Sequence, residues 1–563
     1  RRSLPPFLVY AVLIALVTPP VVAWYIRLAF YAFAFLVFSV VWPSDAKLTS
    51  ASGAPSRSQR RVFLGVLIVA GLALVVSRLL PFFRYGNTPL GYDTGFYLSS
   101  MQASTHGILT GIGHRNIRAL IWLPLSWLGI SPIAYLHGLY VLTQFLIAGM
   151  VYAYARTMRA THVFAYGATA LFLFAVSIPQ FFAYWWMYYQ TELAIAFLLT
   201  ALILLRRRSF LAFIVGAFGA AIHPATFLPL IVALATFLAI QLLRSLVRLR
   251  PLDPGTRFLL LGSVITVLAT VPFTERIAVF VRTYLRATAF TYGWFIADYP
   301  IQFQAQLSGL YVPLPVVHLA GVYLLPFALA SVVRFAWRRW SRDAQANAQF
   351  LFLLVYGVVL LILVIAGVIY ANRYLIYLDL ALMLLAVPSV VRFVRVSLRD
   401  RSGYALAVLL GVGLLIHGGT VVAKQEPHLT ESERQEIIAL TVIAEQGAYA
   451  MSTISHYTPW VNAFSGRATI DPGYLSANRW DYAKWQEFWS GKSDARRHEL
   501  LRMYHRPIYV FMGIHALEDQ LPYIRFIQTD PYFSQMSPHV WRYVPGAISD
   551  AEIAAMREAE RAR

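Results

Sequence analysis

The sequence predicts a polytopic α-helical membrane protein with about 13 transmembrane helices and a soluble C-terminal α/β domain. Of its 563 residues, 59% are hydrophobic and only 13% are charged. A water-soluble domain usually carries about 25% charged residues. Several apolar runs reach about 20 residues, the length that crosses ~30 Å of hydrocarbon. Acidic residues become frequent only after residue 423, where the composition changes sharply.

The formal net charge of +21 does not indicate a nucleic-acid-binding protein, because the charge is unevenly distributed. Residues 424–563 hold 15 Lys+Arg and 17 Asp+Glu, which leaves 32 of the 47 basic and 9 of the 26 acidic residues to residues 1–423. Basic clusters between apolar runs are the positive-inside signal of membrane proteins, and they can also contact anionic lipid. The absence of cysteine excludes disulfides, thiolate metal sites and a cysteine nucleophile.

The basic clusters predict the orientation of the chain. If all of them are cytoplasmic, each is separated from the next by an even number of crossings. The clusters are Lys47–Arg61, Arg156 with Arg159, Arg206–Arg208, Arg244–Arg250, Arg334–Arg342 and Arg392–Arg401. The predicted spans that satisfy this rule are 6–20, 22–42, 62–82, 134–155, 161–180, 190–205, 209–222, 225–243, 257–274, 311–333, 349–369, 374–391 and 403–422.

The same rule places the N-terminus in the cytoplasm and the C-terminus outside, in what we expect to be a bacterial inner membrane. We read the first two apolar runs, which meet at Pro19-Pro20, as a helical hairpin rather than a cleaved signal peptide. The apolar stretch Ile117–Ile130 is short, and counting it as a span would break the charge pattern. It is therefore predicted to be a helix lying in the membrane interface.

Three outer segments are long enough to be functional or to form a domain: 83–133, 275–310 and everything after 423. We expect a transmembrane domain over residues 1–423 and an extracytoplasmic α/β domain over residues 424–563, which is large enough for its own core. Within the second domain, Glu431–Gln446 is predicted to be a helix, and Ala448–Ile454 and Pro507–Met512 short strands.

Four of the nine acidic residues of the membrane part are expected at or near the outer face: Asp93, Glu192, Glu275 and Asp298. A carboxylate near the membrane is costly unless it is paired, hydrated or functional. Their gathering on one side predicts a functional site there.

Asp93 lies in the sequence Gly-Tyr-Asp-Thr-Gly-Phe-Tyr, within the first long outer loop. The flanking glycines allow close approach of the backbone, and Tyr92 and Tyr97 can line a sugar-sized pocket. An equally simple interpretation is that Asp93 caps a helix beginning at Thr94.

The other candidates also have two interpretations. Glu192 follows an aromatic stretch typical of the membrane interface. His223 lies between two predicted helices and Asp298 precedes a proline, so both can be ordinary turn residues. Arg373 falls in a short outer loop, against the charge rule, and calls for an anionic partner. That partner is either Asp379 in the same helix or a lipid phosphate held by the guanidinium fork.

This pattern resembles the GT-C superfamily of membrane glycosyltransferases, which includes protein O-mannosyltransferases, aminoarabinose transferases and oligosaccharyltransferases. Asp93 occupies the place of the family's acidic residue in the first outer loop, and Ile117–Ile130 that of its interfacial helices. Arg373 in Asn-Arg-Tyr-Leu-Ile-Tyr looks like the family's phosphate-binding arginine. Tyr457–Arg467 looks like the Trp…Ser-Gly-Arg stretch of bacterial members. The chain departs from the family in having a single acid, no Trp-Trp-Asp-Tyr-Gly motif and no Asp-x-Asp pair.

The resemblance implies an inverting glycosyltransferase that moves a sugar from a polyprenyl-phosphate donor to a glycan, lipid or protein acceptor at the outer face. Asp93 would be the general base and Arg373 the phosphate clamp, with Glu192, His223, Tyr92, Tyr97 and Asp298 as further substrate-binding residues. No metal ligands or cofactor are indicated, although a divalent metal stays possible. A transporter or flippase, a polymerase or ligase of lipid-linked glycans, and a non-catalytic scaffold are the alternatives.

Overall fold

A computed structural model describes ten helices within the first 400 residues and an α/β region at the C-terminal end. The described stretches are 57–85, 125–158, 162–174, 189–247, 254–270, 321–338, 344–365, 371–397 and, with short gaps, 429–562, together with scattered single residues. Parts of the predicted architecture lie outside the described residues: the span 6–20, all but Ala34 of 22–42, most of 403–422 and nearly all of the segment 275–310.

The helices of the first part are apolar on nearly all sides, as expected of helices buried in a bundle or in lipid. They are α3 (Arg57–Tyr85), α7 (Pro132–Met158), α8 (His162–Phe174), α10 (Tyr189–Arg206), α11 (Leu211–Ile222), α12 (Pro224–Val247), α13 (Pro254–Thr270), α16 (Gly321–Arg338), α17 (Ala344–Ile365) and α18 (Ala371–Ser397).

Four helical segments of the described part are long and apolar enough to cross a membrane, and several shorter apolar helices accompany them. The four are Leu64–Tyr85, Pro132–Thr157, Thr226–Val247 and Tyr374–Phe393. In the last of these, on α18, 89% of the residues are buried inside the protein, whereas only 19% are buried in the first, on α3. Helix α18 is therefore the centre of the bundle, and α3 presents leucines and valines to its surroundings. These helices indicate a membrane protein.

The C-terminal region contains a mixed five-stranded sheet in the order β2-β1-β3-β5-β4. Strand β1 pairs in parallel with β2 and β3, and β5 pairs antiparallel with β3 and β4. The strands are β1 (Tyr449–Ser452), β2 (Ala468–Ile470), β3 (Ile508–Phe511), β4 (Phe533–Ser537) and β5 (Val540–Tyr543). The helices are α20 (Glu431–Ile443), α21 (Thr458–Phe464), α22 (Tyr482–Ser490), α23 (Asp494–Arg502), α24 (Ile514–Glu518), α25 (Pro522–Thr529) and α26 (Asp550–Ala562).

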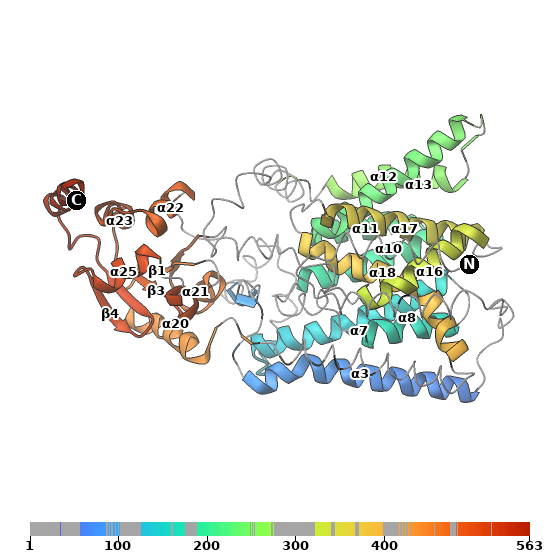
Figure 1. Ribbon diagram of the computed structural model, residues 1–563, viewed down its shortest axis with the longest axis horizontal. Helices are drawn as coiled ribbons and strands as arrows, with labels where there is room; N and C mark the ends of the chain where they lie inside the picture. Colours follow the sequence, from blue (N-terminus) through green and yellow to red (C-terminus); the bar gives the residue numbers. More distant parts are fainter. Residues whose placement is uncertain are drawn as a thin grey trace.

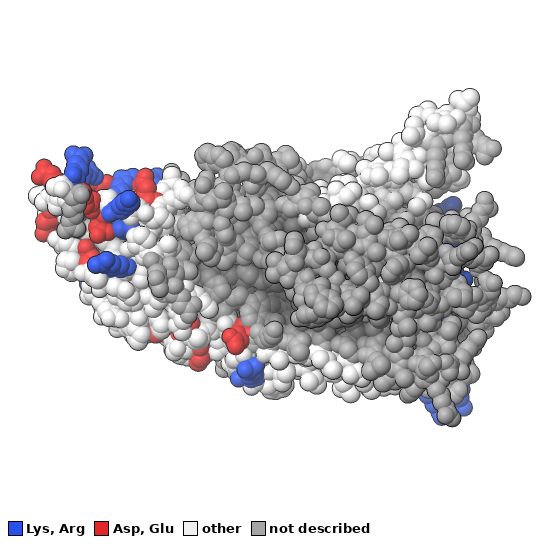
Figure 2. Space-filling model, viewed as in Figure 1, with Lys and Arg blue, Asp and Glu red and all other residues white. Residues whose placement is uncertain are grey.

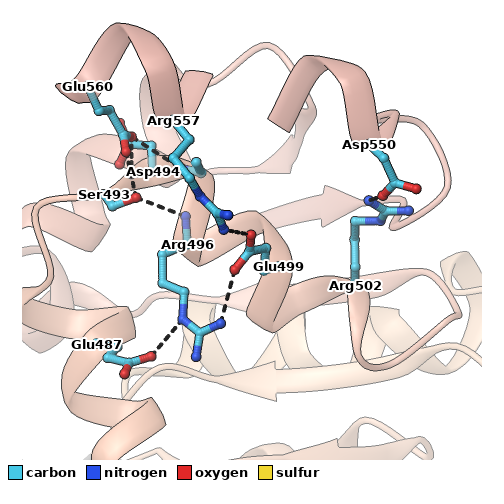
Figure 3. A network of polar contacts seen from close by, with 10 residues as sticks. Glu487, Ser493, Asp494, Arg496, Glu499, Arg502, Asp550, Arg557 and Glu560 are labelled. Atoms are coloured by element: carbon cyan, nitrogen blue, oxygen red, sulfur yellow. Dashed lines mark hydrogen bonds and ion pairs between the residues drawn. The ribbon is translucent and has the colours of Figure 1, made fainter. Parts of the chain in front are cut away.

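Hydrogen bonds and ion pairs join helix α26 to α23 (Figure 3). The Glu560 carboxylate accepts hydrogen bonds from Ser493 Oγ at 2.6 Å and from the backbone N–H of Asp494 at 2.7 Å. Those groups form the N-terminus of α23, where an anion is favourable because the backbone N–H groups have no helical partner. Arg557 of α26 pairs with Glu499, and Arg502 with Asp550. The last helix thus belongs to the α/β region.

The C-terminal region and the helical bundle lie at opposite ends of the molecule (Figure 1). On the face in Figure 2, described charged side chains gather over the C-terminal elements, and the described surface of the helices is largely uncharged. The two parts share one hydrophobic cluster. It contains Tyr97, Leu98 and Met101 of the first long loop segment and Tyr140 of α7 together with Trp460 of α21. The first loop segment is therefore packed against the C-terminal region.

Candidate functional site

The first turn of α10 carries the carboxylate of Glu192 into a buried polar network. Glu192 is 3% exposed, and its position at the start of the helix favours a negative charge. Gln144 of α7 donates from Nε2 to Glu192 Oε2 at 2.6 Å, and the same Nε2 lies 3.3 Å from the hydroxyl oxygen of Tyr140. The buried amide of Gln144 therefore fixes the orientation of the Glu192 carboxylate.

The second branch of the network starts at Thr191, the residue before Glu192. Its hydroxyl lies 3.5 Å from Nε2 of His223, the residue between α11 and α12. His223 ends α11: its backbone leaves the helical region and its N–H bonds to the carbonyl of Gly219. On the other side of the ring, Nδ1 lies 2.8 Å from the Thr226 hydroxyl, which is 2.6 Å from the hydroxyl of Tyr377 on α18.

The structure thus brings two of the predicted site residues, Glu192 and His223, together around the start of α10. The two branches connect α10 to α7, α12 and α18, and all of their members are buried. The two branches meet only through the backbone between Thr191 and Glu192. Each can orient a polar group of a bound molecule, because its side chains are fixed by buried hydrogen bonds. The second branch reaches α18 at Tyr377, one helical turn after position 373.

The other predicted site residues are only partly described. Tyr92, Asp93 and Asp298 lie outside the described residues. Arg373 belongs to the first turn of α18, so the helix begins earlier than the predicted span 374–391, and the described part does not include its side chain. Tyr97 is 7% exposed and lies in the cluster shared with the C-terminal region. A role for these residues stays a prediction.

Polar residues inside apolar helices are the signal that the sequence interpretation missed. Gln144, Thr226 and Tyr377 complete the network, and each interrupts an apolar run. His137 also does so. It is 4% exposed, neither ring nitrogen has a hydrogen-bond partner among the described residues, and its ring centroid lies 5.2 Å from that of Phe82. Spacings of three and seven residues place His137, Tyr140 and Gln144 on one face of α7.

Among the residues that the structure describes, no three His, Asp or Glu side chains form a group that could hold a metal ion.

Comparison with solved structures decides the fold. Two crystal structures of the oligosaccharyltransferase of Archaeoglobus fulgidus match the chain. One, tethered to an acceptor peptide containing the NVT sequon, is 15% identical, with a TM-score of 0.55 over 82% of this chain and 70% of that one. The other, in complex with Zn and sulfate, is 14% identical, with a TM-score of 0.52 over 79% and 68%.

The chain has the GT-C fold. No protein-family model and no curated protein matches the sequence. The predicted resemblance is therefore confirmed at the level of the fold, and the sequence identity is too low to transfer individual residues or their roles.

Proposed function

We propose that this protein is a glycosyltransferase that moves a sugar from a polyprenyl-phosphate donor to a hydroxyl acceptor at the outer face of a bacterial inner membrane. The observation that carries the proposal is the GT-C fold, which the chain has in common with an oligosaccharyltransferase. The proposal includes the 13 spans, a cytoplasmic N-terminus and an extracytoplasmic C-terminal domain. A lipid-linked donor suits a bundle of apolar helices, because the isoprenoid chain stays in lipid while the phosphate lies at the interface.

In the proposed reaction, the acceptor oxygen attacks the anomeric carbon and its proton passes to the carboxylate of Asp93. The bond between the anomeric carbon and the phosphate oxygen breaks, and the polyprenyl phosphate leaves with the electron pair. Arg373 stabilises the charge that develops on this phosphate through its planar guanidinium group. Attack opposite the leaving group inverts the anomeric configuration.

The neighbouring described residues support a site at this place. Gly91 has a φ of +87°, which favours glycine, and the N–H of Thr94 bonds to the Gly91 carbonyl at 3.2 Å. Glu192 and His223 are buried polar groups, and we propose that they orient the donor through the network that joins α10 to Tyr377.

Purified Asp93→Asn protein tests the proposal with a labelled polyprenyl-phosphate sugar and a hydroxyl acceptor. Loss of a general base reduces the rate about 10²–10⁴-fold, and the expected result is a reduction of that size in kcat. Glu558→Gln, an exposed acid on α26, is the matched control and should transfer at the parent rate. Asp93→Asn protein with parent activity would remove Asp93 from the role, and a parent protein that transfers no sugar would refute the proposed reaction.

A further inference from the structure

The chain segment around Asp93 is held by the C-terminal region at two described points, five residues before Asp93 and two residues after it. The first point is Thr88, which is 4% exposed. Its hydroxyl donates to Glu431 Oε2 at 2.8 Å, and its N–H bonds to the carbonyl of Tyr85, the last residue of α3. Thr88 thus connects the end of α3 to the start of α20.

The carboxylate of Glu431 is oriented and ionised for accepting this hydrogen bond. It also accepts from Arg434 Nε at 2.8 Å and from Gln435 Nε2 at 2.7 Å, both on α20. The hydrogen bond from Arg434 is the main reason that the pKa of Glu431 is lowered to about 2. The carboxylate is therefore ionised at neutral pH and can only accept, and its neighbours on the helix fix its orientation.

The second point is Gly95, which touches the backbone of α21. A Cβ atom added to Gly95 would lie closer than 3.0 Å to the carbonyl carbon and oxygen of Pro459. These are backbone atoms of a short helix whose next residues, Trp460 and Val461, are fully buried. Neither partner can move aside without displacing the core of the C-terminal region, so the contact admits only glycine.

We propose that Thr88, Gly95 and Glu431 are positioning residues through which the C-terminal region holds the Asp93 segment in its reactive place. They touch neither the donor nor the acceptor. They restrict the segment on both sides of Asp93, and Leu98 and Met101 continue the attachment into the shared hydrophobic cluster. This inference rests on the proposed function for the role of Asp93. The attachment itself can be measured separately.

Thr88 provides the sharper test, because its hydroxyl can be removed without changing the shape of the side chain. In the full-length protein, Thr88→Val should lower kcat at least about tenfold, the equivalent of 1.4 kcal/mol, while the KM for the donor stays unchanged. Hydrogen exchange of the backbone amides of residues 86–101 should become faster. Thr88→Ser keeps the hydroxyl and should restore both readouts, which a loss of general stability would not allow.

Gly95→Ala tests the second point, and Gly149→Ala on α7 is the matched control. A Cβ on Gly149 would meet no atom within 4 Å, so this variant should behave as the parent. Gly95→Ala should lower kcat and speed amide exchange in the same segment. If Gly95→Ala does not fold, Thr88→Val and Glu431→Gln still test the proposal, by their kcat and by the amide exchange of residues 86–101.

Unchanged amide exchange in residues 86–101 of both Thr88→Val and Gly95→Ala would overturn the inference, whatever the activity. Faster exchange with parent kcat would also overturn it, since the segment would then be attached without consequence for the reaction. A parent protein without transferase activity refutes the proposed function instead, and the exchange measurement distinguishes the two failures.

Discussion

Gln144 and Glu192 join α7 to α10 through a hydrogen bond of 2.6 Å between amide nitrogen and carboxylate oxygen, with both side chains only 3% exposed. Gln144→Leu removes a donor from a buried carboxylate, which costs about 1–3 kcal/mol. We expect a lower melting temperature of the detergent-solubilised protein. Gln241→Leu on α12 is the control and should leave the melting temperature unchanged. An equal response of both variants would contradict a structural role for this hydrogen bond.

Thr226 and Tyr377 are 151 positions apart in the sequence, and their hydroxyls lie 2.6 Å from each other. Because the two hydroxyls are hydrogen-bonded to each other, the effects of Thr226→Val and Tyr377→Phe should not be additive. A double-mutant cycle on the free energy of unfolding should give a coupling of about 0.5–1.5 kcal/mol. Additive effects within about 0.3 kcal/mol would mean that the two hydroxyls do not interact.

Stability of the C-terminal region should fall in acid because two carboxylates are stabilised in their ionised form. Burial raises the pKa of Glu433, but hydrogen bonds from Thr430, Ile514 and Tyr457 outweigh it and lower the pKa below its ordinary value of 4.5. Hydrogen bonding to Arg434 lowers the pKa of Glu431 to about 2.

Such groups bind fewer protons in the folded than in the unfolded state, so their contribution is complete above about pH 5 and is lost as the pH falls through the folded pKa. Thermal unfolding between pH 7 and pH 2.5 should show a falling melting temperature below about pH 4.5, with a smaller fall in Glu433→Gln. A flat profile in the parent, or an identical fall in the variant, would contradict this assignment.

Glu560 caps the start of α23 from a different helix, and its removal should therefore loosen two helices at once (Figure 3). Loss of a helix cap costs about 0.5–2 kcal/mol. Glu560→Ala should lower the melting temperature and make α26 accessible to limited proteolysis. Glu558→Ala, an exposed position on the same helix, should change neither measurement. Protection of α26 in the Glu560 variant would indicate that the contacts of Arg557 and Asp550 suffice.

Apolar length and the positions of the basic clusters predicted many element positions in the part of the chain that the structure describes. The span 209–222 corresponds to α11 at Leu211–Ile222, and the helix expected from Glu431 begins there as α20, behind a Thr430 capping box. The strands expected near 448–454 and 507–512 are β1 and β3. These features are local, so a short window of sequence contains the information.

The contacts between helices could not be predicted in this way, because apolar periodicity does not say which helices are neighbours. The network therefore appears in the sequence only as isolated polar residues such as Gln144 and Thr226. The structure gives the arginine of the Ser-Gly-Arg motif a structural role. Arg467 donates to the carbonyls of Thr441 at 3.1 Å and Ala444 at 2.7 Å, at the C-terminal end of α20. A cation there satisfies carbonyls that the helix leaves unpaired.

The hydrophobic cluster that includes both Tyr97 and Trp460 bears on how the protein can be handled. If residues 424–563 were expressed alone, the side of Trp460 and its neighbours that meets the first loop segment would be exposed to water, and such a fragment would tend to aggregate. Attachment of the two parts through one shared core further implies that cutting the chain between them will leave them associated in the membrane.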